Sequence, residues 1–222
     1  MKQTTINCIK KEFEKLNINI HSFSHVNIIL VIIASILGSI GLLTNNYQTV
    51  IASKIIGLAL IPFISLSIII LTGDIKLIST SLGKCILFVF ICLIVGAIIG
   101  FINSYNNYVT EPTPEMMSRS NFKYHKFELE LLVSFISGIG IYYSIVKTSI
   151  IAFIGLVLVV SIIPPICNAG ILYGMSLHKY MQNNTVKHNE YITYGNNSFM
   201  LFAVDITGVF LGFLSVFVFN CL

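Results

Sequence analysis

The sequence predicts an all-α integral membrane protein, a bundle of six transmembrane helices arranged as two inverted three-helix repeats. Of its 222 residues, 55% are hydrophobic and only 10% are charged, with a mean hydropathy of +0.88. Soluble domains carry about 25% charged residues. The same order of apolar segments occurs twice, in residues 26–103 and 127–220, and proline interrupts the middle segment each time. Because three crossings are an odd number, the second repeat must lie inverted in the membrane.

Residues 1–25 are predicted to form a polar tail before the transmembrane domain of residues 26–222. Ile9, Phe13 and Leu16 recur at helical spacing among lysines and glutamates, which is typical of amphipathic helices on membrane surfaces. A surface helix and an unstructured tail both stay open. The first apolar segment ends in LLTNN rather than at a small-residue cleavage site, so we expect a retained first helix and not a signal peptide.

The first repeat contains three apolar segments, and a helix needs about 20 such residues to cross a bilayer. The segments cover residues 27–43, 49–71 and 85–102. Pro62 lies near the middle of the second one. Proline lacks an N–H group and its ring clashes with the preceding turn, so we expect the helix to kink or unwind there.

A polar linker of residues 104–126 joins the two repeats and contains the stretch EPTPEMMSR. The second repeat has the same layout as the first, with Pro164 and Pro165 inside its middle segment and a polar loop expected before its last segment. The three apolar segments are residues 127–146, 149–177 and 199–219, and the loop is residues 178–197.

Lysine placement predicts the orientation of the chain in the membrane. Four lysines precede the first apolar segment, and none occurs in the TNNYQ turn that follows it. Since lysine and arginine favour the cytoplasmic side, we predict that both termini are cytoplasmic. The net charge of +4 is small, and no basic, aromatic-rich patch suggests a nucleic-acid partner. The lipid bilayer is the expected partner, and a homo-oligomer stays open.

Several short segments carry a resemblance to one family. They are IGLLTNN, a proline-interrupted span that ends in LTGD, the stretch TPEMMSR, and IIPPICNAGILYG. In order and spacing across residues 26–220 they are similar to a family known only as domain of unknown function 389. The resemblance implies a polytopic membrane protein and no established activity. The chain departs from the family at Val204-Asp205, where members often have Thr-Asn, and in having a short tail where many members have a soluble domain.

Asp205 is the foremost candidate for a functional residue, because it lies inside the last apolar segment. Carboxylates within a membrane face the bundle interior or water, and they commonly relay protons or bind cations. The alternative is a neutral or paired aspartate that only hydrogen-bonds a neighbouring helix. Lys54, near the start of the second segment, either reaches the membrane interface or pairs with Asp205.

The prolines mark two expected unwound points at matching places in the repeats. Such breaks free backbone groups that can coordinate an ion or polar solute near the membrane midplane. Asn168 and Ser65 can add side-chain ligands close to the breaks. The alternative is a plain proline kink, which is common in membrane helices. The residues proposed for this ion or solute site are Asp205, Asn168, Pro62, Pro164, Pro165 and Ser65.

Three charged residues of the linker form a candidate gate at one mouth of the pathway, namely Glu111, Glu115 and Arg119. Our main expectation for this stretch is nevertheless a capped surface turn. Pairs of glycines four residues apart in GAIIG, GILYG and GVFLG allow helices to approach closely, within one chain or between copies. These helix-packing glycines are Gly96, Gly100, Gly170, Gly174, Gly208 and Gly212.

No motif in the sequence indicates an enzyme, since GxSxG, HExxH and phosphate-binding loops are absent. The five cysteines form no CxxC pair, and His21 and His25 lack a third ligand, so we expect no catalytic residue, metal site or cofactor. The leading hypothesis is passage of an ion or small polar solute across a membrane, as a channel or proton-coupled transporter. The alternative is a membrane assembly or regulatory protein that does not transport.

Overall fold

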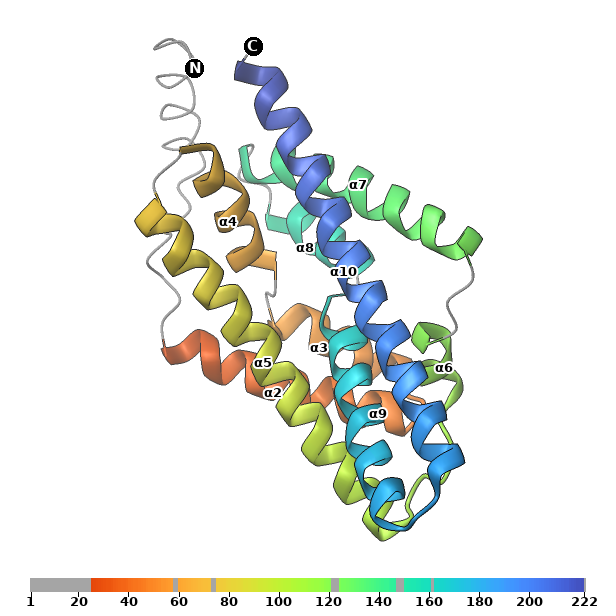
Figure 1. The fold of residues 1–222 in the computed structure, drawn as a ribbon. Coiled ribbons are helices and arrows are strands. Elements are labelled where there is room, and N and C mark those ends of the chain that lie inside the picture. Colours follow the sequence, from red (N-terminus) through yellow and green to blue (C-terminus); the bar gives the residue numbers. More distant parts are fainter. Residues whose placement is uncertain are drawn as a thin grey trace.

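The computed structural model describes residues 25–57, 60–72, 75–120, 124–146, 150–160 and 162–221, and all regular structure in these ranges is α-helical (Figure 1). The predicted tail lies outside the described residues, apart from His25. The helices of the described chain are α2 (His25–Leu43), α3 (Tyr47–Gly57), α4 (Leu60–Thr72), α5 (Ile75–Asn106), α6 (Pro114–Ser120), α7 (Tyr124–Val146), α8 (Ile150–Val159), α9 (Ile163–Met181) and α10 (Thr185–Cys221).

Three described helices are long and apolar enough to cross a bilayer. Their spanning parts are Ile78–Asn106 of α5, Phe127–Ser144 of α7 and Thr185–Val216 of α10. A shorter apolar stretch, Asn27–Leu43, makes up most of α2. Many large apolar side chains of α5 and α10, such as Phe90, are exposed, as a surface in contact with lipid requires. The chain is an all-helical, multi-pass integral membrane protein.

Pro62 lies within helix α4, as the third of its described residues, and α3 extends to Gly57. Residues 58 and 59 lie outside the described part of the chain. An interruption of this proline-containing segment therefore stays a prediction.

The second proline-containing segment is divided into two helices before its prolines, which the first turn of a helix tolerates because the N–H groups there have no acceptor within the helix. Helix α8 ends at Val159, and α9 begins at Ile163 with Pro164 and Pro165 in its first turn. All of residues 162–172 are buried. The break therefore precedes these prolines, and it lies inside the molecule rather than on its surface.

The polar loop predicted for residues 178–197 was wrong, because most of this region is helical. Helix α9 continues to Met181, and α10 begins at Thr185 after a tight turn. Asn183 adopts a φ of 57° in that turn, a left-handed conformation that asparagine tolerates better than most residues. Tyr191 explains the long extension of α10: its ring is buried and its hydroxyl donates to the Thr110 carbonyl at 3.1 Å.

Helix α9 lies between α5 and α10, and it contacts both of them (Figure 1). Glycines make the contact with α5 close. A Cβ on Gly96 would lie 2.6 Å from the Cys167 carbonyl oxygen, and a Cβ on Gly174 would overlap the Ala97 carbonyl oxygen. The contacts advance along both helices in the same direction, so α5 and α9 are parallel. The GAIIG and GILYG motifs thus face each other within one chain.

The third glycine motif packs α10 against α7. A Cβ on Gly208 would lie 2.6 Å from Ser134 Cβ, and one on Gly212 would overlap the Phe135 carbonyl oxygen. Gly138 of α7 completes the contact, since a Cβ there would overlap the Val209 carbonyl oxygen. These contacts also advance in the same direction, so α7 and α10 are parallel.

Candidate polar site at the helix breaks

Lys54 connects α3 to the end of α8. It belongs to the last turn of α3, and its Nζ donates to the Leu158 carbonyl oxygen of α8 at 3.1 Å. The last carbonyls of a helix have no donor within it, so the ammonium satisfies one of those that the break leaves free. Lys54 is only 9% exposed. The interpretation that it reaches the membrane interface was therefore wrong.

Asp205 lies midway along α10 and is only 2% exposed. Ser134 of α7 donates from its Oγ to Asp205 Oδ1 at 2.7 Å. The two residues meet where Gly208 lets α7 and α10 approach each other. Lys54 and Glu130 lie close enough to act electrostatically on the Asp205 carboxylate. Within the part of the chain that the structure describes, Lys54 and Asp205 form no direct ion pair.

Asn168 of α9 is fully buried, and its side chain faces α6 and α10. Its Nδ2 lies 3.0 Å from the Met116 carbonyl oxygen, 3.0 Å from Ser120 Oγ and 2.7 Å from Ser198 Oγ. The amide has two hydrogens, so it donates to two of these three acceptors at a time. Its Oδ1 has no partner among the described residues. A buried acceptor without a partner is costly, and it is available to a water molecule or solute.

The C-terminal carbonyls of α6 are held by side chains of the neighbouring helices. Besides the bond from Asn168 to Met116, Ser198 donates to the Arg119 carbonyl oxygen at 3.3 Å. Asn197 donates to the Ser120 carbonyl oxygen at 2.9 Å. Helix α6 is thereby docked onto α9 and α10 beside the second break.

The start of α6 is tied to the first half of the chain. Thr113 donates to the Leu42 carbonyl oxygen at 2.6 Å, and its Oγ1 accepts from the Met116 N–H at 3.3 Å. Asn45 accepts from the Glu115 N–H at 3.1 Å. The stretch EPTPEMMSR is therefore not the expected surface turn, because most of it forms a helix that joins the two halves of the bundle.

Two of the three candidate gate residues form an ion pair within α6. Arg119 Nη1 lies 2.6 Å from Glu115 Oε2. Arg119 is 9% exposed, and its Nε has no partner among the described residues. Glu111 lies outside α6 and is exposed.

The candidate residues fall into two neighbouring groups, one around Asn168 and one around Asp205. The two residues share no hydrogen-bond partner within the described chain. Ser198, which binds Asn168, lies about two turns before Asp205 on the same helix, so the two groups are neighbours along α10. Pro62, Pro164 and Pro165 are buried in the first turns of α4 and α9. Ser65 lies in α4, and its side chain is outside the part that the structure describes.

The serines of both groups were missed by sequence reasoning. Ser134 binds Asp205, whereas Ser120 and Ser198 bind Asn168 and lie 3.1 Å from each other. Serine is common in membrane helices, where it often donates to a carbonyl of its own helix. Nothing in the local sequence distinguishes a serine that contacts another helix from one that does not.

The fold and these contacts define a class, that of multi-pass membrane proteins with ionisable and amide side chains buried among their helices. A family model described as Domain of unknown function (DUF389) matches residues 55–211. The chain belongs to this family, which confirms the resemblance seen in its sequence. No curated protein and no solved structure matches the chain.

Proposed function

We propose that the chain passes an ion or small polar solute across a membrane, as a channel or proton-coupled transporter. The observation that carries the proposal is the burial of Asp205 in a membrane-spanning helix, within electrostatic range of Lys54 at the second break. Ionisable groups inside a membrane cost several kcal/mol or more. Such groups usually mark an ion or solute path rather than a packing contact.

The proposal includes six crossings in two inverted repeats, which are α2, α3–α4 and α5, followed by α7, α8–α9 and α10. The division before Pro164 supports it, and Pro62 lies at the matching place in the first repeat. The parallel contacts support it as well, because alternating crossings place α5 parallel to α9 and α7 parallel to α10. Helix α6 would then serve as the gate, with its Glu115–Arg119 ion pair beside Asn168. The lysines before the first span favour cytoplasmic termini.

We predict that Asp205→Asn abolishes proton-coupled passage and leaves the fold intact. The amide oxygen of asparagine can still accept from Ser134 Oγ, but the side chain can no longer bind or release a proton. The measurement is the flux of protons, Na⁺ and K⁺ into liposomes that contain the purified protein. Circular dichroism and the elution volume in detergent report on folding.

The matched control for this variant is Glu128→Gln, which removes an exposed carboxylate from α7 and should leave all fluxes unchanged. A folded Asp205→Asn protein with fluxes equal to those of the wild type would show that the carboxylate has no role in passage. Loss of folding in this variant would give Asp205 a structural role instead.

Water access provides a test that does not depend on knowing the solute. Single cysteines at positions 168 and 205, in a chain whose own five cysteines are replaced, should react with a membrane-impermeant thiol reagent in liposomes. A cysteine in place of Ile141, a fully buried core residue, should stay protected. Protection at all three positions in folded protein would favour the alternative function.

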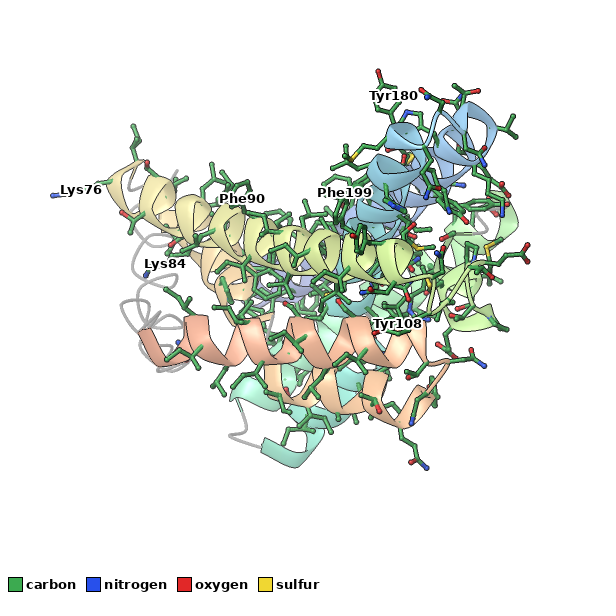
Figure 2. The ribbon with its side chains drawn as sticks, turned by 90° about the horizontal axis from the view of Figure 1, so that it is seen from below. Lys76, Lys84, Phe90, Tyr108, Tyr180 and Phe199 are labelled. Atoms are coloured by element: carbon green, nitrogen blue, oxygen red, sulfur yellow. The ribbon has the colours of Figure 1, made fainter. Side chains whose placement is uncertain are left out.

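The alternative is a membrane assembly or regulatory protein, and one feature of the surface favours it. An apolar groove of about 440 Å³ lies between α5 and α10, with Phe63 of α4 among its lining residues. Phe90 and Phe199 line the groove, and Figure 2 shows both on the same side of the molecule. A helix of another membrane protein could pack there without disturbing the polar site.

A further inference from the structure

Two cysteines that lie far apart in the sequence meet where α2, α5 and α9 pack together. Cys92 of α5 and Cys167 of α9 are free thiols, fully buried, and close enough to interact directly. They meet because Gly96, one turn after Cys92, lets α5 and the Cys167 region of α9 approach closely. Our expectation of no metal site rested on the absence of a CxxC pair, and it does not extend to thiols that packing brings together.

Ser35 of α2 contacts both sulfur atoms. Its Oγ lies 3.2 Å from Cys92 Sγ, and its carbonyl oxygen accepts from Cys167 Sγ at 3.7 Å. The same Oγ lies 2.7 Å from the Val31 carbonyl oxygen. A hydroxyl has one hydrogen, so it donates to one of these two neighbours at a time. It can therefore turn towards the sulfur when the sulfur becomes the more negative acceptor.

Ser39, one turn further along α2, supplies a second hydroxyl. It is fully buried, and its Oγ has no hydrogen-bond partner among the described residues. It lies close enough to the Cys167 thiol to act on it. A buried hydroxyl without a partner is costly, and that cost falls if the Cys167 sulfur becomes a thiolate and accepts a charge-assisted hydrogen bond from Ser39. Three helices thus gather two sulfur ligands and two hydroxyl donors.

We infer that Cys92 and Cys167 form a binding site for one soft monovalent cation, of which Cu⁺ is the type. Thiolates are the ligands that select Cu⁺, and two of them can hold it from opposite sides. Binding releases both thiol protons to the buffer, so the cation and the two sulfurs together carry one negative charge. The hydroxyls of Ser35 and Ser39 stabilise that charge by donating to the sulfurs. The site uses neither Asn168 nor Asp205, and the inference does not rest on the proposed passage.

The test measures Cu⁺ binding by a protein that has only these two thiols. Cys8, Cys85 and Cys221 would be replaced by serine, which leaves Cys92 and Cys167. The purified protein in detergent, kept anaerobic with ascorbate, would compete for Cu⁺ with bathocuproine disulfonate, whose coloured complex reports the ion that the protein does not hold. We expect one Cu⁺ bound per chain, and an excess of K⁺ should not displace it.

The matched control keeps two buried thiols that do not meet. It retains Cys85 and Cys92 and carries Cys167→Ser; Cys85 lies about two turns from Cys92 on the same helix. This control should hold no Cu⁺ against the competitor, and neither should Cys92→Ser in the two-thiol protein. Ser39→Ala should keep the site but bind Cu⁺ about tenfold more weakly, because it removes a hydrogen bond to a charged sulfur.

Three outcomes would overturn the inference. The first is equal Cu⁺ binding by the two-thiol protein and by the control. The second is binding that survives the replacement of either Cys92 or Cys167. The third is a two-thiol protein that elutes and unfolds as the wild type does but holds no Cu⁺. If the two-thiol protein does not fold, the wild type is compared with its own Cys167→Ser variant, which should bind one ion fewer; equal binding would again overturn the inference. None of these readouts depends on flux, so passage can fail its own test independently.

Discussion

Replacing Gly212 by alanine should destabilise the protein by about 1–3 kcal/mol, and Gly174→Ala should do so to a similar extent. The added Cβ at Gly212 would overlap the Phe135 carbonyl oxygen of α7, and that at Gly174 would overlap the Ala97 carbonyl oxygen of α5. Both overlapping atoms belong to the backbone, which cannot change to another rotamer as a side chain can. Two whole helices must therefore separate, and every contact along them weakens.

The sign of this effect is informative, because alanine is the better helix former. In an unobstructed helix interior the same substitution is favourable by about 1 kcal/mol. Gly83 of α5 and Gly155 of α8 are such positions, since a Cβ on either meets nothing within 4 Å. Gly83→Ala and Gly155→Ala should be neutral or stabilising.

The measurement is the free energy of unfolding of all four variants in mixed micelles of mild and denaturing detergent. Equal stability for the Gly212 and Gly174 variants and their controls would contradict the close helix contacts. Destabilisation only in samples that contain dimers would instead place the glycines between copies of the chain.

Replacing Asn168 by leucine should release α6 from the bundle and cost about 2–3 kcal/mol. Leucine has a similar shape but no donor, so the two hydrogen bonds that Nδ2 shares among the Met116 carbonyl, Ser120 Oγ and Ser198 Oγ are lost. The two hydroxyls can still bind each other. The buried polar groups would be only partly compensated, and α6 is expected to open towards water.

Hydrogen exchange followed by mass spectrometry can measure this opening. Amides of residues 115–120 should exchange at least about tenfold faster in Asn168→Leu, since 1.4 kcal/mol corresponds to a factor of ten. Amides of α7 should keep their wild-type rates. Asn106→Leu is the matched control, because the side-chain amide of Asn106 donates to a carbonyl of its own helix at an exposed position. Unchanged exchange in α6 would show that Asn168 does not hold it.

The sequence by itself determined the class of protein and the small residues through which its helices pack closely. Long apolar runs predicted α5 and α10, because hydrocarbon excludes charge and demands internal backbone hydrogen bonds. The glycine pairs predicted close helix packing, and Pro164 and Pro165 predicted an interruption within a few residues of their positions. The residue types within each segment are sufficient to predict these features.

The ends of the helices were less predictable. Residues 178–197 are too polar to indicate a membrane segment, yet most of them are helical because α9 and α10 extend beyond their apolar parts. Tyr191 secures part of this extension by bonding to Thr110, a residue far away in the chain. Hydropathy detects the segment that contacts lipid and does not detect where its helix stops.

Only the tertiary structure decided which polar groups meet. Lys54 could reach the interface or turn inward, and it turns inward because the break before α9 leaves the Leu158 carbonyl free. Asn168 faces α6, and Asp205 faces Ser134 of α7. Each partner lies far away in the sequence, and which side chains meet depends on how the helices pack. Periodicity and composition determine that a helix forms and that it contacts lipid, whereas the packing of several helices determines what its buried polar groups bind.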